Sequence, residues 1–502
     1  MPAILGPILG FRGADDATWR VSALWVLPAQ DPAPKPTATG AVVAIAPAVA
    51  LAMSAERTAW RVDFSVTRPN KSEVYVEYAL PGAAKNWFAV PSAKLPLQTG
   101  FASCNGFADP KYKKKVVGPR NARWEHLFGK HKKHPLHVLL LGGDQVYGDS
   151  IWRACELDWL AKWLDLGAKK KAELDPTPEQ RKAVAKFYFD LYCERWQQEG
   201  VKDVLAGAPT LMMWDDHDIF DGWGSHDEPL QNTVVFKAIF AEADAAFRVF
   251  QLQVKPGESP PGSIAGAALS YAQRVNDIAI VVLDLRSERT PEQVLAPKSW
   301  ERVLAAIDLA AAAGPKHLFV VSGPPVLFPS ASTFEKIVDA IPGEQDVEDD
   351  LRDRWGSKPH LVARETLVQR LLRAAAANRV RVTLLSGDVH MAALGMIKST
   401  RQPAPPPDAH IIYNLVSSPI VHAPPSKLAI FALKLLDKDL EIGRDIEAKM
   451  MKLPGADARY LAQRNWLRLR GDAAGVINAE WWVESKDPSK DVMYAKPINP
   501  VA

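Results

Sequence analysis

The hydrophobic pattern of the chain changes near residue 95. Before it, short alternating or apolar runs recur between proline, glycine and asparagine residues, as in WRVSALWVL (19–27), WRVDFSVTRP (60–69) and SEVYVEYAL (72–80). Alternation with a period of two is typical of antiparallel strands. Residues 1–95 are therefore predicted to form a small, all-β N-terminal sandwich domain.

After residue 95, near-continuous apolar runs end at polar or acidic residues. These runs are HVLLLGGD (137–144), TLMMWDDHD (210–218), IAIVVLDLRS (278–287), HLFVVSG (317–323) and VTLLSGDVH (382–390). Helical patterns lie between them and include insertions near 150–205 and 225–270. Strands alternating with helices predict a layered α/β domain over 96–502, with ligands collecting at the carboxyl ends of the strands. The stretch 468–498 is predicted to form a hairpin on one edge of this sheet.

The composition is that of a globular protein without a strong overall field. The 502 residues are 47% hydrophobic and 24% charged, and 61 basic residues nearly balance 58 acidic ones. No nucleic-acid partner is predicted, and the lysine runs at 111–115 and 130–134 are interpreted as solvated loop charge. With three cysteines, no apparent export signal and no apolar run of ~18 to 20 residues, we expect a cytoplasmic protein without an integral membrane segment.

The stretch MMWDDHDIFDGWGSHDE (212–228) concentrates six acidic residues and two histidines among aromatic rings. Asp215, Asp216 and Asp218 follow a predicted buried strand, where carboxylates repel one another unless a cation lies between them. A divalent or trivalent metal would supply that charge. The alternative is an exposed acidic turn.

Asp144 and Tyr147 form a second candidate group, just after two glycines that let the chain turn sharply. A carboxylate and a phenolate on one side of a turn can hold a trivalent cation such as iron(III). The alternative is that Asp144 or Asp149 caps a helix starting near Ile151.

Asp388 and His390 alternate across Val389, so they point to one side if the preceding strand continues. The pair could bind neighbouring metals, although a histidine after a strand can also be a satisfied core residue. Cys104 is either a ligand or a small buried hydrophobe.

Arg286 and Arg289 are candidates for binding phosphate oxygens, because a guanidinium matches them with two hydrogen bonds. Ion pairing with Asp284 or Glu288 is the alternative.

Five motifs in this order carry a family resemblance: ASCN (102–105), GGDQVYGD (142–149), WDDHD (214–218), LDLRSER (283–289) and SGDVHMA (386–392). Together they resemble the PhoD-like alkaline phosphatases, a branch of the calcineurin-like and purple-acid-type metallophosphoesterases. The resemblance implies a four-layer α/β/β/α catalytic domain, and the preceding β-sandwich also resembles that family's N-terminal domain.

The resemblance also implies the roles of individual residues. It assigns an iron (Fe³⁺) position to Cys104, Asp144, Tyr147 and His390, with Asp144 bridging to a second metal. Asp216 and Asp388 would bind that second, divalent metal, which is calcium, manganese or zinc. His217 matches the catalytic histidine.

The implied activity is hydrolysis of a phosphate ester by a metal-activated hydroxide, with monoester and diester substrates both left open. Two features depart from the wider superfamily: SCN replaces its opening Asp-x-His, and no histidine follows the strand at 317–322. The alternatives are a calcium-dependent binding protein and a non-catalytic interaction protein on the same fold.

Overall fold

The computed structural model describes residues 3–116, 118–329, 355–401, 409–435, 440–485, 487 and 490–502. The N-terminal region is all β, as predicted. Its strands are β1 (Leu5–Ala14), β2 (Thr18–Pro28), β3 (Thr37–Thr39), β4 (Val43–Ile45), β5 (Val49–Met53), β6 (Arg57–Thr67), β7 (Glu73–Ala79) and β8 (Asn86–Pro91). A three-stranded sheet in the order β3-β7-β8 packs beside the other strands, with Tyr78 in ring contact with Trp25 and Phe64.

The first large sheet joins the N-terminal strands to the catalytic region. Its order is β22-β21-β20-β9-β10-β11-β1-β2-β6-β4, and β5 pairs with β6. The central strands β9 (Gln98–Ala102), β10 (Val138–Gly142) and β11 (Thr210–Met213) are parallel, and β1 pairs in parallel with β11. One continuous sheet therefore crosses the predicted boundary at residue 95.

The predicted C-terminal hairpin is present on this sheet. It consists of β20 (Asn465–Gly471) and β21 (Ile477–Val483), and β20 pairs with β9. A third strand, β22 (Val492–Ile498), extends it outward, and residues 486, 488 and 489 lie outside the described residues.

The second sheet has the order β12-β13-β14-β15-β17-β16-β18, with β19 paired to β16. Its strands are β12 (Tyr271–Val275), β13 (Ile278–Val282), β14 (His317–Ser322), β15 (Arg381–Ser386), β16 (Ala392–Ser399), β17 (Ile411–Ser417), β18 (Ile446–Met451) and β19 (Tyr460–Leu461). The core strands β13, β14, β15 and β17 are parallel and almost fully buried, because both of their faces are covered.

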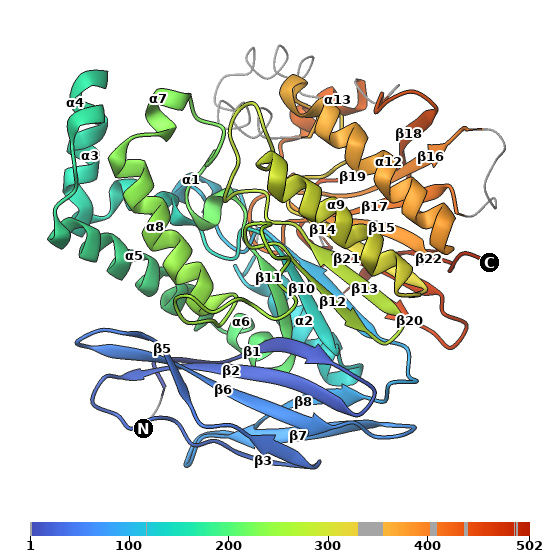
Figure 1. Ribbon diagram of the computed structural model, residues 1–502, viewed down its shortest axis with the longest axis horizontal. Coiled ribbons are helices and arrows are strands. Elements are labelled where there is room, and N and C mark those ends of the chain that lie inside the picture. The colour runs from blue at the N-terminus through green and yellow to red at the C-terminus, as the bar shows by residue number, and fades with distance from the viewer. Residues whose placement is uncertain are drawn as a thin grey trace.

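Helices cover the outer face of each sheet (Figure 1). The first sheet is flanked by α2 (Ala122–Lys133), α5 (Pro178–Trp196), α6 (Val201–Gly207) and α8 (Val234–Phe250), and the second by α9 (Pro297–Ala312), α12 (Leu361–Asn378) and α13 (Lys427–Leu435). One apolar core includes residues of both sheets, such as Phe101 and Leu385, and a second core lies under α9 and α12. This is the predicted four-layer α/β/β/α arrangement, which is confirmed.

The helical insertion predicted near 150–205 consists of α3 (Asp158–Leu164), α4 (Ala168–Glu173), α5 and α6. The insertion predicted near 225–270 consists of α7 (Glu228–Gln231) and α8. A short helix, α1 (Pro110–Lys113), and 3-10 turns at Gly148–Arg153, Cys155–Leu157, Asp216–Asp218 and Lys358–His360 complete the described elements. Among the described helices, none combines the length and the apolar character needed to cross a bilayer.

Candidate metal centre

Side chains from the ends of four strands converge between the two sheets. Donor atoms of Cys104, Asp144 and His390 lie within 4.8 Å of one another, and so do those of Asp144, Asp216 and His217. Cys104 follows β9, Asp144 follows β10, Asp216 follows β11 and His390 follows β15. Because Asp144 belongs to both groups, the cluster has the layout of two adjacent cation positions that share one carboxylate.

The backbone at these strand ends adopts an uncommon conformation. Cys104, Asp144, Asp388 and His390 have φ values of 58°, 55°, 65° and 54°. L-residues other than asparagine, aspartate and histidine rarely enter this left-handed region, and residues held there cluster at functional sites. The fold therefore bends the chain sharply at each of these positions and turns the side chains inward.

Asp144 is buried, and its hydrogen-bonding capacity is only partly used. One oxygen lies 3.4 Å from Cys104 Sγ, while Oδ1 has no hydrogen-bond partner among the described residues. Burial raises the pKa of Asp144 well above its usual value; His217 opposes this shift and Asp215 and Asp216 reinforce it. The folded protein alone thus stabilises the charged carboxylate poorly.

Tyr147 and Cys104 are also buried acidic groups whose charged forms the surrounding protein stabilises poorly. The buried Tyr147 hydroxyl has no hydrogen-bond partner among the described residues, and its ring packs on Gly106, where a Cβ would lie 2.2 Å from Tyr147 Cδ2. Burial raises the pKa of both groups, with Asp144 adding to the shift. Each would ionise more readily beside a cation.

His217 is held by a carboxylate on its Nδ1 side. Asp149 Oδ2 lies 3.0 Å from His217 Nδ1, and Asp149 Oδ1 also accepts a hydrogen bond from the Asp221 backbone amide at 2.9 Å. Burial alone would lower the pKa of His217, but Asp149 and Asp216 outweigh it and raise the pKa well above the usual value. The Nδ1 contact fixes the ring, while Nε2 lies 3.9 Å from Asp221 Oδ1.

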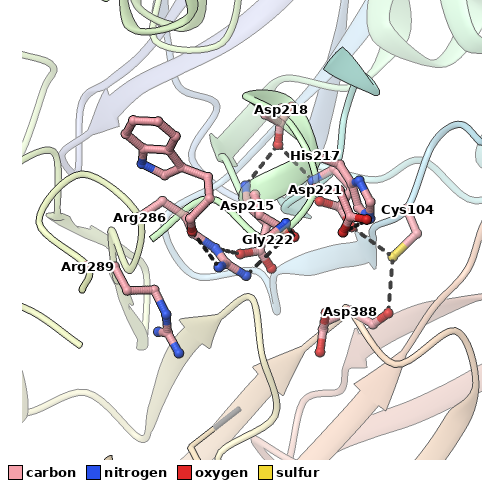
Figure 2. A network of polar contacts seen from close by, with 12 residues as sticks. Cys104, Asp215, His217, Asp218, Asp221, Gly222, Arg286, Arg289 and Asp388 are labelled. Carbon is pink, nitrogen blue, oxygen red and sulfur yellow. Dashed lines mark hydrogen bonds and ion pairs between the residues drawn. The ribbon is translucent and has the colours of Figure 1, made fainter. Parts of the chain in front are cut away.

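Arg286 is fully buried beneath the acidic turn. Its guanidinium contacts Asp215 Oδ1, as Figure 2 shows. It also contacts Asp216 Oδ1 at 3.3 Å and donates to the Trp223 carbonyl at 3.2 Å. These contacts make Arg286 a positioning group for Asp216. The buried Arg289 lies 3.3 Å from His360 Nδ1, and the predicted phosphate-binding role of both arginines stays a prediction.

Two possibilities that the sequence left open are excluded by the geometry. The strand does not continue through Asp388 and His390, because β15 ends at Ser386 and both residues have positive φ. Neither Asp144 nor Asp149 caps a helix: Tyr147 precedes the 3-10 turn and makes no side-chain cap, and Asp149 instead contacts His217. The Asp388 carbonyl lies 3.9 Å from Cys104 Sγ, whereas its carboxylate belongs to neither donor group, so its role as a ligand stays a prediction.

The sequence pattern does not reveal the partner of His217 or a further histidine at the centre. From the pattern, Asp149 is a candidate helix cap only. His422 is buried, and its ring lies 3.9 Å from that of His390 and 5.7 Å from that of Tyr147. The apolar run of β17 before His422 resembles the runs before the other candidates, so the same strand-end argument could have found it.

Comparisons with known proteins agree with this fold. The family model described as PhoD related phosphatase matches residues 98–342 and 340–447, and the chain therefore belongs to that family. The resemblance seen in the five motifs is confirmed, and membership supports hydrolase activity at the level of the family.

Two individual similarities extend over most of the chain. An uncharacterized protein of Saccharomyces cerevisiae, YGR266W, is 26% identical over 498 residues, covering 81% of this chain and 70% of the yeast protein. The solved structure of PhoD superposes with a TM-score of 0.57 at 13% identity, covering 98% of this chain and 92% of that one. At this identity the second similarity concerns the fold.

Proposed function

We propose that this protein is a metal-dependent hydrolase of phosphate esters. The observation that carries the proposal is the pair of donor groups that share Asp144. Family membership supports phosphatase chemistry, and the geometry supports two cations. Phosphomonoesters and phosphodiesters are both candidate substrates.

The donor set fits cations at both positions. Thiol, phenol, carboxylate and imidazole groups from Cys104, Tyr147, Asp144 and His390 suit a trivalent iron, since three of them become anionic beside it. Asp144 and Asp216 suit a divalent calcium, manganese or zinc ion, with Asp388 as a further candidate ligand. The raised pKa values of Asp144, Tyr147 and Cys104 are what acidic ligands show when no cation offsets their charge.

When bound, the two cations would neutralise phosphoryl oxygens and lower the pKa of a water molecule, so that hydroxide forms near neutral pH. Hydrolysis forms a bond from the water oxygen to phosphorus and breaks the bond from phosphorus to the ester oxygen. His217 donates its Nε2 proton to that leaving oxygen while Asp149 holds Nδ1. General acid catalysis of this kind contributes roughly 10²- to 10⁴-fold.

The test is hydrolysis of p-nitrophenyl phosphate and bis-p-nitrophenyl phosphate by protein stripped of metal and then reloaded with iron and calcium, manganese or zinc. We expect activity only after reloading, and loss of nearly all of it in Asp144→Asn. Asp165→Asn, an exposed carboxylate on the helical insertion, is the matched control. Full activity of the stripped protein or of Asp144→Asn would refute the proposal.

A spectroscopic measurement tests the iron position separately. Iron(III) bound to a phenolate absorbs visible light by charge transfer, so the iron-loaded protein should be coloured and Tyr147→Phe should lose the band. An active, iron-loaded protein without the band would remove Tyr147 from the ligand set.

A further inference from the structure

A group of cations lies beside the metal centre on the segment that follows Cys104. Helix α1 places the Tyr112 ring 4.8 Å from the His422 ring, and His422 lies 3.9 Å from His390. Two ring contacts thus connect α1 to a candidate ligand. The lysines at 111, 113, 114 and 115 surround Tyr112 and are exposed.

The lysine charges are directed toward this ring contact. Lys111 Nζ lies 5.1 Å and Lys115 Nζ 4.9 Å from the Tyr112 ring centroid. Lys113, Lys114 and Lys115 form no ion pair with a described carboxylate, whereas Lys162 on α3 pairs with Asp158 at 2.6 Å.

Arg120 adds a cation that is more buried. Its guanidinium carbon lies 5.2 Å from the Phe107 ring centroid, and Phe107 is in ring contact with His422 at 5.8 Å. Nε of Arg120 is buried without a hydrogen-bond partner among the described residues. Burial lowers the pKa of Arg120, and Tyr147 opposes the shift.

The neighbouring Arg195 provides a contrast. It is also buried, but it donates to the Asn105 carbonyl, to the side-chain oxygens of Asn105 and Asn121 and to Gln198 Oε1 at 2.7 Å. Arg195 is therefore a structural crosslink with its donors in use. Arg120, Lys113, Lys114 and Lys115 form no ion pair with a described carboxylate, so their charge is available at the edge of the centre.

We propose that Arg120 and Lys115, supported by Lys113 and Lys114, bind a second anionic group on the part of the substrate that leaves. The preferred substrates are then small esters that carry a phosphate or carboxylate besides the phosphate being cleaved. The inference rests on the proposed function and narrows its substrate class. Its physical basis is that an unpaired cation gains most from an anion where burial limits the screening by water.

The experiment compares two sugars that differ by one phosphate: glucose 6-phosphate and glucose 1,6-bisphosphate. Phosphate release by the metal-loaded protein gives kcat/KM for each, and p-nitrophenyl phosphate serves as a substrate with no second anion. We expect kcat/KM of the wild type to be roughly tenfold or more higher for the bisphosphate, because one charge-assisted hydrogen bond contributes a factor of about this size. The preference should appear in KM and should weaken with added salt.

Single substitutions test which cations cause the preference for the bisphosphate. Arg120→Gln should lower the ratio of the two kcat/KM values roughly tenfold and Lys115→Gln roughly threefold, because the lysine is the more exposed cation. Arg120→Lys should restore part of the ratio. Lys170→Gln, an exposed lysine on α4, is the control and should leave the ratio as in the wild type.

The inference is overturned if the wild type hydrolyses both sugars equally, or if the Arg120 and Lys115 variants lower both values by the same factor. In either case hydrolysis of p-nitrophenyl phosphate would leave the proposed function standing. If the metal-loaded protein hydrolyses none of the three esters, the proposed function fails and this inference fails with it.

Discussion

Two buried carboxylates at the centre, Asp218 and Asp144, differ in how their oxygens are used. Asp218 accepts hydrogen bonds at 2.8–3.2 Å from the backbone amides of Asp144, Gln145, Val146 and Asp215 and from Gln251 Nε2. Asp144 has one contact, with Cys104 Sγ, and an oxygen without a described partner. Sequence position alone does not separate the two, since both follow a buried strand.

A structural carboxylate is thus distinguished from a candidate ligand by whether hydrogen-bond donors already occupy its acceptor oxygens. Asp218 ties the turn after β10 to the turn after β11 and so fixes the position of Asp144. Burying an oxygen atom that has no hydrogen-bond partner costs free energy in a folded protein, and a bound ion would offset that cost.

Added metal should stabilise the protein through Asp144. At a concentration about 1,000 times the dissociation constant, a bound ion raises the free energy of unfolding by roughly 4 kcal/mol. Denaturant unfolding with and without the ions measures this gain. Asp144→Asn should lose most of it, and an undiminished gain in that variant would place the ions elsewhere.

Asp218→Asn should destabilise the metal-free protein by about 3 kcal/mol, because an amide nitrogen would face backbone N–H groups that now donate to a carboxylate. Urea unfolding is the measurement, with Asp165→Asn as the exposed control. Equal stability of the two variants would contradict the structural role of Asp218.

The opposite sign is expected for Asp144→Asn without metal. Removing a buried, poorly compensated charge should raise the free energy of unfolding by about 2 kcal/mol at neutral pH. Urea unfolding of chelator-treated protein measures it. A loss of stability as large as that of Asp218→Asn would erase the contrast between the two carboxylates.

His131 tests whether an unpartnered buried atom is sufficient to indicate a ligand. Its Nε2 has no described partner, but it belongs to neither donor group and its ring stacks on Trp87 at 4.8 Å. Burial lowers the pKa of His131 from 6.5 to about 4. The unfolded chain therefore binds the proton more tightly, so stability is full above pH 6.5 and falls as the pH drops toward 4.

For His131 this loss should reach about 1 kcal/mol at pH 5.5 relative to neutral pH. His131→Gln removes the titrating group, so its unfolding free energy should depend less on pH by that amount. An identical pH dependence in the variant and the wild type would show that His131 does not titrate as its burial requires.

The sequence predicted the layers of the fold because buried parallel strands leave long apolar runs. It did not predict β1, whose Gly6, Pro7, Gly10 and Gly13 interrupt the hydrophobic pattern. The join between the N-terminal strands and the catalytic sheet depends on β1 pairing with β11, about 200 residues later in the chain. Pairing over such a distance is not encoded in local periodicity.

The candidate site was predictable where a chemically distinctive residue follows a strand, as with Asp144, Asp216 and His390. The supporting contacts were not. Asp149 reaches His217 across 68 positions and Arg286 reaches Asp215 across 71, so these contacts become visible only once the sheets are assembled. The saturation of Asp218 likewise depends on amides that belong to another strand end.

Anomalous X-ray scattering from crystals of the metal-loaded protein would locate the bound ions directly. We expect two adjacent peaks, one bounded by Cys104, Asp144 and His390 and the other by Asp144 and Asp216. Ions that lie away from Asp144, or one ion without a neighbour, would contradict the claim that this carboxylate joins two metal positions.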